Sequence, residues 1–143
     1  HLLSETRQTR DNWILTPHPG EAARLLRTDT ASVQADRLGA AVRLSGTYGG
    51  VAVLKGAGTL VTTGVDSFSL CDRGNPGMAT AGMGDVLAGL LGGLAVQGGD
   101  LQSVAQAGVL IHAACGDAAA ASGERGLLAG DLMAHIRKWV NLH

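Results

Sequence analysis

A glycine-rich segment in the middle of the chain carries the strongest chemical signal of the sequence. Residues 75–85 read Asn-Pro-Gly-Met-Ala-Thr-Ala-Gly-Met-Gly-Asp and lead directly into an apolar stretch that is typical of a helix. The first backbone N–H groups of a helix have no intrahelical partner, and the helix dipole places partial positive charge beside them. Glycines at this point let a phosphate approach the backbone closely, so the segment predicts an anion-binding site.

Asp85, at the end of this segment, has two alternative interpretations. Asp is a leading N-cap residue, and an isolated Gly-Asp pair before a helix usually marks no more than a cap. Here Gly82 and Gly84 flank Met83 just ahead of Asp85, and a cap alone requires neither glycine. The glycines favour a role of Asp85 beyond capping, and both interpretations stay open.

Three more glycines, Gly89, Gly92 and Gly93, lie inside the helix expected after Asp85. Each costs roughly 1 kcal/mol relative to Ala in a helix interior. We expect close packing or the approach of a ligand to account for them, with packing against another helix as the simpler alternative.

A second candidate segment reads Lys-Gly-Ala-Gly-Thr over residues 55–59 and follows the continuous apolar run of residues 51–54. Ligands of open parallel sheets bind just beyond the carboxyl ends of strands, and this segment lies at such an end. It lacks the Gly-x4-Gly-Lys-Ser/Thr order of a Walker A loop. By itself it is a weak signal, and a turn before a hairpin is the favoured alternative.

A third candidate segment, residues 16–21, reads Thr-Pro-His-Pro-Gly-Glu and again follows a short apolar run. Its two prolines stiffen the loop and fix the directions of His18 and Glu21. The alternative is a rigid strand–helix turn in which Glu21 complements the helix N-terminus.

The elements that must position these three loops are mixed strands and helices. Apolar runs predict strands over residues 13–15, 51–54, 60–63 and 68–71, the last two forming a hairpin. Helical spacing predicts helices from about residue 21, from an N-cap at Thr30 to a stop at Gly46, over residues 85–97 and 101–122, and from an N-cap at Asp131 to residue 140. We expect an α/β fold in one domain, with a layered sheet and flanking helices.

Composition excludes several classes of protein. The formal net charge is −1 and no block of Lys or Arg stands out, so we expect no nucleic-acid partner. No apolar stretch reaches the roughly 18 uninterrupted residues of a membrane span, and no signal peptide is visible, so we expect no membrane partner. Cys71 and Cys115 are too few for a disulfide framework. We expect them to be free thiols of a cytoplasmic protein.

His112, Cys115 and Asp117 lie along one expected helix, but their spacings do not make a convincing metal site. We therefore assign them packing roles and expect no metal ion held by protein side chains.

Four phrases of the sequence together resemble the NAD(P)H-hydrate dehydratase family of the ribokinase-like superfamily. They are LTPHPGEAARLL, GGVAVLKGAGT, NPGMATAGMGDVLAG and GERGLLAGDL, in this order between about Trp13 and Val140. Related vitamin kinases share the Gly-x-Gly-Asp element but not its combination with the other phrases. The resemblance implies a ribokinase-like fold and the dehydration of (6S)-NAD(P)H hydrate to NAD(P)H. This hydro-lyase reaction of nicotinamide nucleotide repair uses Mg²⁺ and ADP or ATP, and it releases AMP or ADP with phosphate. The TPHPGEA form favours ADP.

The resemblance also implies roles for individual residues. Asp85 corresponds to the catalytic residue, which contacts the hydrated nicotinamide and accepts the proton of its C6 hydroxyl. The implied nucleotide-binding residues are Lys55, Gly56, Ala57, Gly58, Thr59, Asn75, Pro76, Gly77, Met78, Ala79, Thr80, Ala81, Gly82, Met83 and Gly84. The implied substrate-binding residues are His18, Pro19, Gly20, Glu21, Ala22, Ala23, Arg24 and Asp85.

The resemblance covers only the C-terminal part of the longer family domain. We therefore expect residues 1–143 to form the C-terminal portion of a NAD(P)H-hydrate dehydratase domain, and to show little or no dehydratase activity alone. We also expect a homo-oligomer, because a partial sheet exposes an apolar edge. Two alternatives stay open: a ribokinase-like kinase of a small alcohol or vitamin, and an inactive nucleotide-binding fragment.

Overall fold

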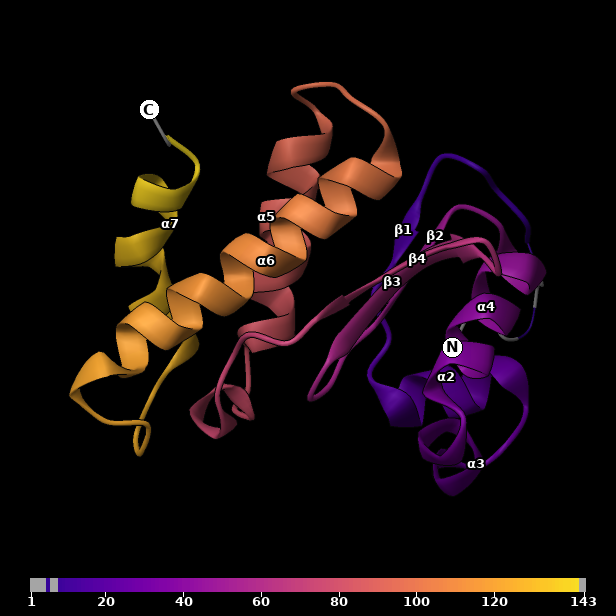
Figure 1. Ribbon diagram of the computed structural model, residues 1–143, viewed down its shortest axis with the longest axis horizontal. Coiled ribbons are helices and arrows are strands. Elements are labelled where there is room, and N and C mark those ends of the chain that lie inside the picture. The colour runs from indigo at the N-terminus through magenta and orange to yellow at the C-terminus, as the bar shows by residue number, and fades with distance from the viewer. Residues whose placement is uncertain (1–4, 6–7, 142–143) are drawn as a thin grey trace.

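The computed structural model describes residues 5 and 8–141 of the chain, which form a four-stranded sheet between two groups of helices (Figure 1). The elements are β1 (Ile14–Leu15), α2 (Pro19–Leu26), α3 (Thr30–Ala35), α4 (Arg37–Tyr48), β2 (Val51–Leu54), β3 (Thr59–Gly64), β4 (Ser67–Cys71), the 3-10 turn η1 (Pro76–Met78), α5 (Met83–Ala95), α6 (Leu101–Ala119), η2 (Ala120–Ser122), η3 (Ala129–Leu132) and α7 (Met133–Trp139). Helices α2, α3 and α4 lie on one side of the sheet, and α5, α6 and α7 lie on the other. The expected α/β architecture is confirmed.

The sheet runs in the order β1-β2-β3-β4, with β1 parallel to β2 and the other neighbours antiparallel. The strand β2 is buried on both faces. Its alternate side chains point to opposite sides, so Ala52 and Leu54 pack with the α2–α4 side while Val51 and Val53 pack with α5 and α6. This double burial explains the continuous apolar run, and the predicted β3–β4 hairpin is confirmed.

The helix predicted from Thr30 to Gly46 is two helices. Asp29, rather than Thr30, caps the first of them by accepting a hydrogen bond from the Ser32 backbone N–H at 2.8 Å. The chain breaks at Asp36, whose carboxylate caps α4. Gly46 does not stop α4. A Cβ at this position would meet nothing within 4 Å, so the glycine leaves no gap in the packing. The helix ends at Tyr48, before Gly49 with φ +73°.

The packing expected around the glycines inside α5 is not found. A Cβ added at Gly89, Gly92 or Gly93 would meet nothing within 4 Å. Close packing against the described residues therefore does not account for them, and the approach of a ligand stays a prediction.

The end of the chain also differs from the prediction. Leu132, rather than Asp131, occupies the N-cap position of α7 and makes no side-chain cap. The Asp131 carboxylate accepts a hydrogen bond from the Leu128 backbone N–H at 2.8 Å, one turn earlier in η3. An acidic residue near the end of a 3-10 turn thus resembles, in the sequence, a cap of the helix that follows.

Helix α6 extends through η2 and is the long apolar element of the fold. Leu101–Ser122 is long and apolar enough, by length and composition alone, to cross a membrane, and 44% of its most apolar window is buried inside the protein. It contains no run of 18 uninterrupted apolar residues, because polar residues such as Gln106 and His112 divide it. It packs against α5, α7 and the sheet, as a core helix does. Both cysteines are free, as predicted.

Candidate functional site

The loop after β2 is held open by a side chain from α4. The Arg37 guanidinium donates hydrogen bonds to the carbonyl oxygens of Leu54 at 3.3 Å and Gly58 at 3.0 Å. Gly56 and Gly58 have φ of +144° and +70°, which L side chains rarely adopt. A Cβ at Gly56 would also lie 2.9 Å from the guanidinium. The two glycines of the KGAGT segment therefore let the loop wrap around Arg37.

The glycine-rich loop before α5 is anchored by the carboxylate of Asp117 on α6. One oxygen accepts a hydrogen bond from the Gly74 backbone N–H at 3.2 Å, and the other accepts one from Asn75 Nδ2 at 3.1 Å. Gly77 must be glycine, because a Cβ there would lie 2.5 Å from the Glu124 carbonyl oxygen. Asp117 therefore positions the loop, a role that its helical spacing alone did not indicate.

Helix α5 begins without a side-chain cap. Gly82 occupies the N-cap position in a left-handed conformation, with φ 86° and ψ −16°. Asp85 is the third residue of the helix, so the alternative that Asp85 is the N-cap is wrong. Its exposed carboxylate makes no hydrogen bond or ion pair within the part of the chain that the structure describes. The free N–H groups of this helix end and one unpaired carboxylate thus lie side by side.

Helix α2 has a closed N-terminus. His18 Nδ1 accepts hydrogen bonds from the backbone N–H groups of Gly20 at 3.0 Å and Glu21 at 3.2 Å. The Glu21 carboxylate accepts one from the His18 backbone N–H at 2.7 Å. This capping box confirms the alternative that Glu21 complements the helix N-terminus. Glu21 also lies 3.8 Å from Lys55 Nζ, which links this loop to the loop after β2.

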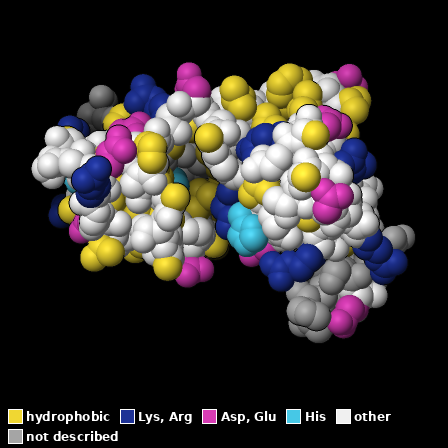
Figure 2. Space-filling model, turned by 90° about the horizontal axis from the view of Figure 1, so that it is seen from below, with side chains coloured by type: hydrophobic (Ala, Val, Ile, Leu, Met, Phe, Trp, Pro, Cys, Tyr) yellow, Lys and Arg dark blue, Asp and Glu magenta, His cyan; other side chains and the backbone are white. Residues whose placement is uncertain are grey.

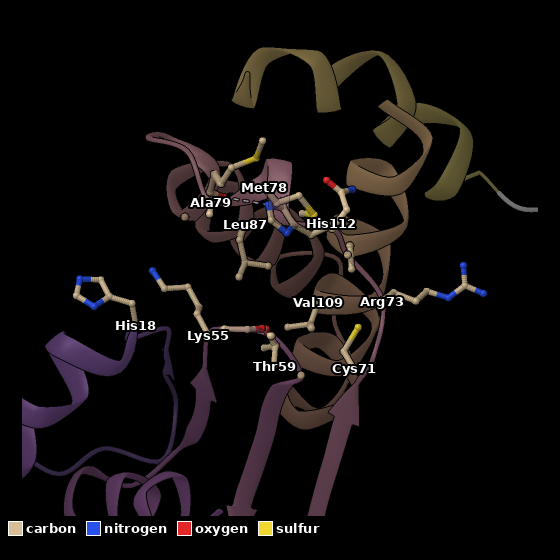
Figure 3. A pocket seen from close by; sticks show the side chains of 18 of the residues that line it. His18, Lys55, Thr59, Cys71, Arg73, Met78, Ala79, Leu87, Val109 and His112 are labelled. Atoms are coloured by element: carbon tan, nitrogen blue, oxygen red, sulfur yellow. Dashed lines mark hydrogen bonds between the residues drawn. The ribbon is translucent and has the colours of Figure 1, made fainter. Parts of the chain in front are cut away.

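All three loops meet at one cavity of about 820 Å³ (Figure 3). The predicted site residues that line it are His18, Pro19, Lys55, Gly56, Ala57, Gly58, Thr59, Asn75, Pro76, Met78, Ala79, Thr80, Met83 and Gly84. A Cβ at Gly84 would lie 3.0 Å from Lys55 Nζ, so the lysine ammonium lies against the first turn of α5. Figure 2 shows the molecule hollowed between its two helical sides, with basic and His side chains at the edge.

The remaining predicted site residues do not line the cavity. They are Gly77, Ala81, Gly82 and Asp85 from the glycine-rich loop, and Gly20, Glu21, Ala22, Ala23 and Arg24 from α2. Ala22 and Ala23 are buried in the core beside α4. Asp85 is the neighbour of a lining residue, Gly84, and is open to solvent. These placements do not test the binding roles, which stay predictions.

One wall of the cavity consists of residues that the sequence did not predict as site residues. Leu87 from α5, Val109, His112 and Ala113 from α6, and Cys71 from the end of β4 face the loops across it. Burial lowers the pKa of His112, and the charge of Lys55 lowers it further, against a raising effect of its hydrogen bond to Met83. The sequence did not indicate a site role for His112, because only the folded chain places α6 against these loops.

The acidic and metal-ligating side chains are dispersed. Among residues 5 and 8–141, no group of three or more His, Cys, Asp or Glu side chains could hold a metal ion. Asp72 supplies a carboxylate to the cavity wall.

The fold and the site together define a class of protein. The structure superimposes on the ADP/ATP-dependent NAD(P)H-hydrate dehydratase of Bacillus subtilis, crystallised with ATP and Mg²⁺, with a TM-score of 0.83 and 27% identity. The match covers 94% of this chain and 52% of that one. A ribokinase-like superfamily protein of Enterococcus faecalis matches with a TM-score of 0.79 and 26% identity, over 96% of this chain and 49% of its own. The chain therefore has the ribokinase-like fold.

The family follows from the sequence comparisons. The family model described as NAD(P)H-hydrate dehydratase matches residues 2–138, so this chain belongs to that family, and the resemblance is confirmed. The bifunctional NAD(P)H-hydrate repair enzyme Nnr of Coxiella burnetii is 54% identical over 99% of this chain and 29% of its own length. The ADP-dependent (S)-NAD(P)H-hydrate dehydratase of Neisseria meningitidis is 43% identical over 98% of this chain and 50% of its own. The chain thus spans half, or less than a third, of these relatives.

Proposed function

We propose that this chain acts in the ADP- or ATP-dependent dehydration of (6S)-NAD(P)H hydrate to NAD(P)H, with ADP preferred. The observation that carries the proposal is the meeting of the loop after β2 with the uncapped start of α5 at one cavity. The printed names of the relatives supply the reaction. The residues of the chain supply a phosphate site and a nearby free carboxylate.

The cavity fits an adenine nucleotide in size and charge. Small-molecule sites have volumes of roughly 300–1,000 Å³, and this one has about 820 Å³. Lys55 Nζ and the N–H groups at the start of α5 provide positive charge at the same place. The glycine at position 84 keeps that place open, because a side chain there would press against the ammonium. We assign the phosphates to this end of the cavity.

Asp85 is the base in this proposal. Its carboxylate would take the proton of the substrate's C6 hydroxyl, while the hydroxyl oxygen bonds to the terminal phosphorus and the bond to the nucleotide's bridging oxygen breaks. The N–H groups of α5 would stabilise charge on the moving phosphoryl group. The C6–O bond then breaks, phosphate leaves, and loss of a proton from the neighbouring ring carbon restores the double bond. His18 and Pro19 line the cavity, and the substrate would lie against residues 18–24.

Mg²⁺ fits the site as a companion of the nucleotide. This ion commonly keeps several waters and is held by substrate phosphates with one or two carboxylates; because Asp72 lies in the cavity wall next to Cys71, the phosphates beside Lys55 would hold the ion. Bound there, Mg²⁺ would neutralise phosphate charge.

The test is a turnover assay on the wild-type protein and on the variant Asp85→Asn. A protein that carries this chain as the C-terminal part of a full-length family domain should restore the absorbance of reduced nicotinamide from hydrated NADH when ADP and Mg²⁺ are present, whereas the 143-residue chain alone should show little or no turnover. Because loss of a general base costs about 10²–10⁴-fold in rate, Asp85→Asn should lose turnover and still bind ADP. A protein that phosphorylates a small alcohol, and never restores the absorbance, would be a kinase instead. Near-wild-type turnover by Asp85→Asn would contradict the assigned role.

A further inference from the structure

His112 is the polar side chain in the apolar wall of the cavity. It projects from α6 between Val109 and Ala113, opposite the loops that carry Lys55 and Thr59 (Figure 3). The same wall includes Leu87 from α5. The residue is half-buried, and its ring reaches across to the first turn of α5.

A hydrogen bond fixes the tautomer of this imidazole. His112 Nε2 lies 3.0 Å from the Met83 carbonyl oxygen. A carbonyl oxygen can only accept, so Nε2 must carry the hydrogen and Nδ1 of the neutral ring must be an acceptor. The lowered pKa of His112, caused first by burial, keeps the ring neutral near pH 7.

The second ring nitrogen has no protein partner. Nδ1 makes no hydrogen bond within the described part of the chain. It is also not one of the buried polar side-chain atoms that lack a partner, as Asn75 Oδ1 is. It is therefore accessible from the cavity that His112 lines. An oriented acceptor in an apolar wall is suited to a ligand donor, because polar groups of this kind fix the orientation of a ligand.

The two ends of the cavity differ in chemistry. Lys55 and Gly84 make one end positive and suited to phosphates. Leu87, Val109 and Ala113 make the other wall apolar. The faces of a purine ring are apolar while its edge is polar, so the base belongs against this wall with an edge toward His112.

We infer that His112 selects the base of the nucleotide by accepting, at Nδ1, a hydrogen bond from the 6-amino group of adenine. The inference depends on the proposed function of this cavity and adds a specificity-determining residue to it. A 6-oxo purine presents an oxygen at the same position, and two acceptors would then face each other. The site should therefore prefer ADP to inosine diphosphate.

The experiment compares the binding of ADP, inosine diphosphate and 2′-deoxy-ADP by calorimetry, in the presence of Mg²⁺. Two variants separate the two ring nitrogens. His112→Gln places an amide N–H near the position of Nε2, which keeps the contact to Met83 but removes the acceptor at Nδ1. His112→Asn places an amide oxygen near the position of Nδ1 and loses the contact to Met83. His135→Gln on α7, a residue outside the cavity lining, is the matched control.

The expected preference for ADP over inosine diphosphate is about 3- to 10-fold, the value of one net hydrogen bond. His112→Gln should bind ADP no better than inosine diphosphate, whereas His112→Asn and His135→Gln should keep the preference. All variants should discriminate against 2′-deoxy-ADP to the same extent as the wild type. Circular dichroism and thermal unfolding of each variant check that the fold is kept.

Three results would overturn the inference alone. The first is equal binding of the two diphosphates by the wild type, which leaves the proposed function standing. The second is a preference that survives in His112→Gln and is lost in His112→Asn, which would make the contact to Met83 the important one. The third is a change in 2′-deoxy-ADP discrimination in His112→Gln, which would place the ribose at Nδ1. A wild-type protein that binds no ADP at all would contradict the proposed function and this inference together.

Discussion

Two helices of this fold begin beside the same cavity, and they begin in opposite ways. The start of α2 is closed by its own side chains, because His18 accepts from two backbone N–H groups and Glu21 accepts from a third. The start of α5 has a glycine at the cap position and no side-chain cap. Free N–H groups at a helix N-terminus normally find a partner. Folding alone therefore completes the start of α2, and the uncapped start of α5 supports our proposal that a ligand binds there.

The largest loss of ADP affinity should come from a substitution that fills the open start of α5. Gly84→Ala adds a methyl group at the place assigned to phosphate, and Lys55 Nζ, 3.0 Å from that methyl group, has to give way by a few tenths of an ångström. Loss of one charge-assisted hydrogen bond weakens ADP binding by roughly 10- to 100-fold. Calorimetry with ADP measures the change, and thermal unfolding should show no loss of stability.

Gly89→Ala is the matched control in the same helix. Its Cβ meets nothing within 4 Å, so it should raise the free energy of unfolding by up to about 1 kcal/mol and leave ADP affinity unchanged. If both variants weaken ADP binding equally, the effect is not local to the helix start.

The next effect should come from the anchor of the glycine-rich loop. Asp117→Ala removes the acceptor for Gly74 N–H and Asn75 Nδ2, and the loop that leads into α5 loses its fixed position. We expect ADP affinity to fall by about 5- to 10-fold and the free energy of unfolding by about 1–3 kcal/mol. Titration calorimetry and urea unfolding measure the two quantities.

Asp29→Ala is the control that separates an effect on the position of the glycine-rich loop from a general loss of stability. Asp29 caps α3, and its pKa is lowered mainly by the hydrogen bond from the Ser32 backbone N–H. This variant should lose stability and keep its affinity for ADP. Unchanged ADP affinity in Asp117→Ala would show that the anchor does not matter for binding.

The smallest change in ADP affinity should come from removing the side-chain cap of α2. His18→Ala removes the side-chain cap of α2, which costs about 0.5–2 kcal/mol of folding free energy. Thermal unfolding should detect the loss, while ADP affinity changes little, since the cap groups face their own helix. A drop in ADP affinity as large as that of Gly84→Ala would remove the distinction between the two helix starts.

Local chemistry made much of this molecule predictable from its sequence. The run at residues 51–54 is apolar throughout because β2 is buried on both faces, and the turn residues after β3 made the hairpin predictable. The loops around residues 18, 55 and 84 were found because glycine and proline mark unusual backbone. Single-residue signals were less dependable, since Gly46 faces open space inside α4 and stops nothing.

The residues that the sequence did not reveal are those whose role depends on distant partners. Arg37 holds the loop after β2 across 21 residues of sequence, and Asp117 holds the glycine-rich loop across 43. His112 reaches Met83 across 29. Each of the three lies on a helix where its spacing fits ordinary packing or a solvent face. Only the arrangement of α4 and α6 around the sheet gives them their function.

We propose that phosphate binds at the start of α5 and not at the start of α2. This difference can be tested directly. An NMR titration of ¹⁵N-labelled protein with ADP and Mg²⁺ reports on each backbone N–H group. We expect the largest shift changes at residues 83–85 and 56–59. The N–H groups of Gly20 and Glu21 should change little, because they already donate hydrogen bonds to His18. Saturable binding that shifts the start of α2 and leaves residues 83–85 unchanged would contradict this proposal.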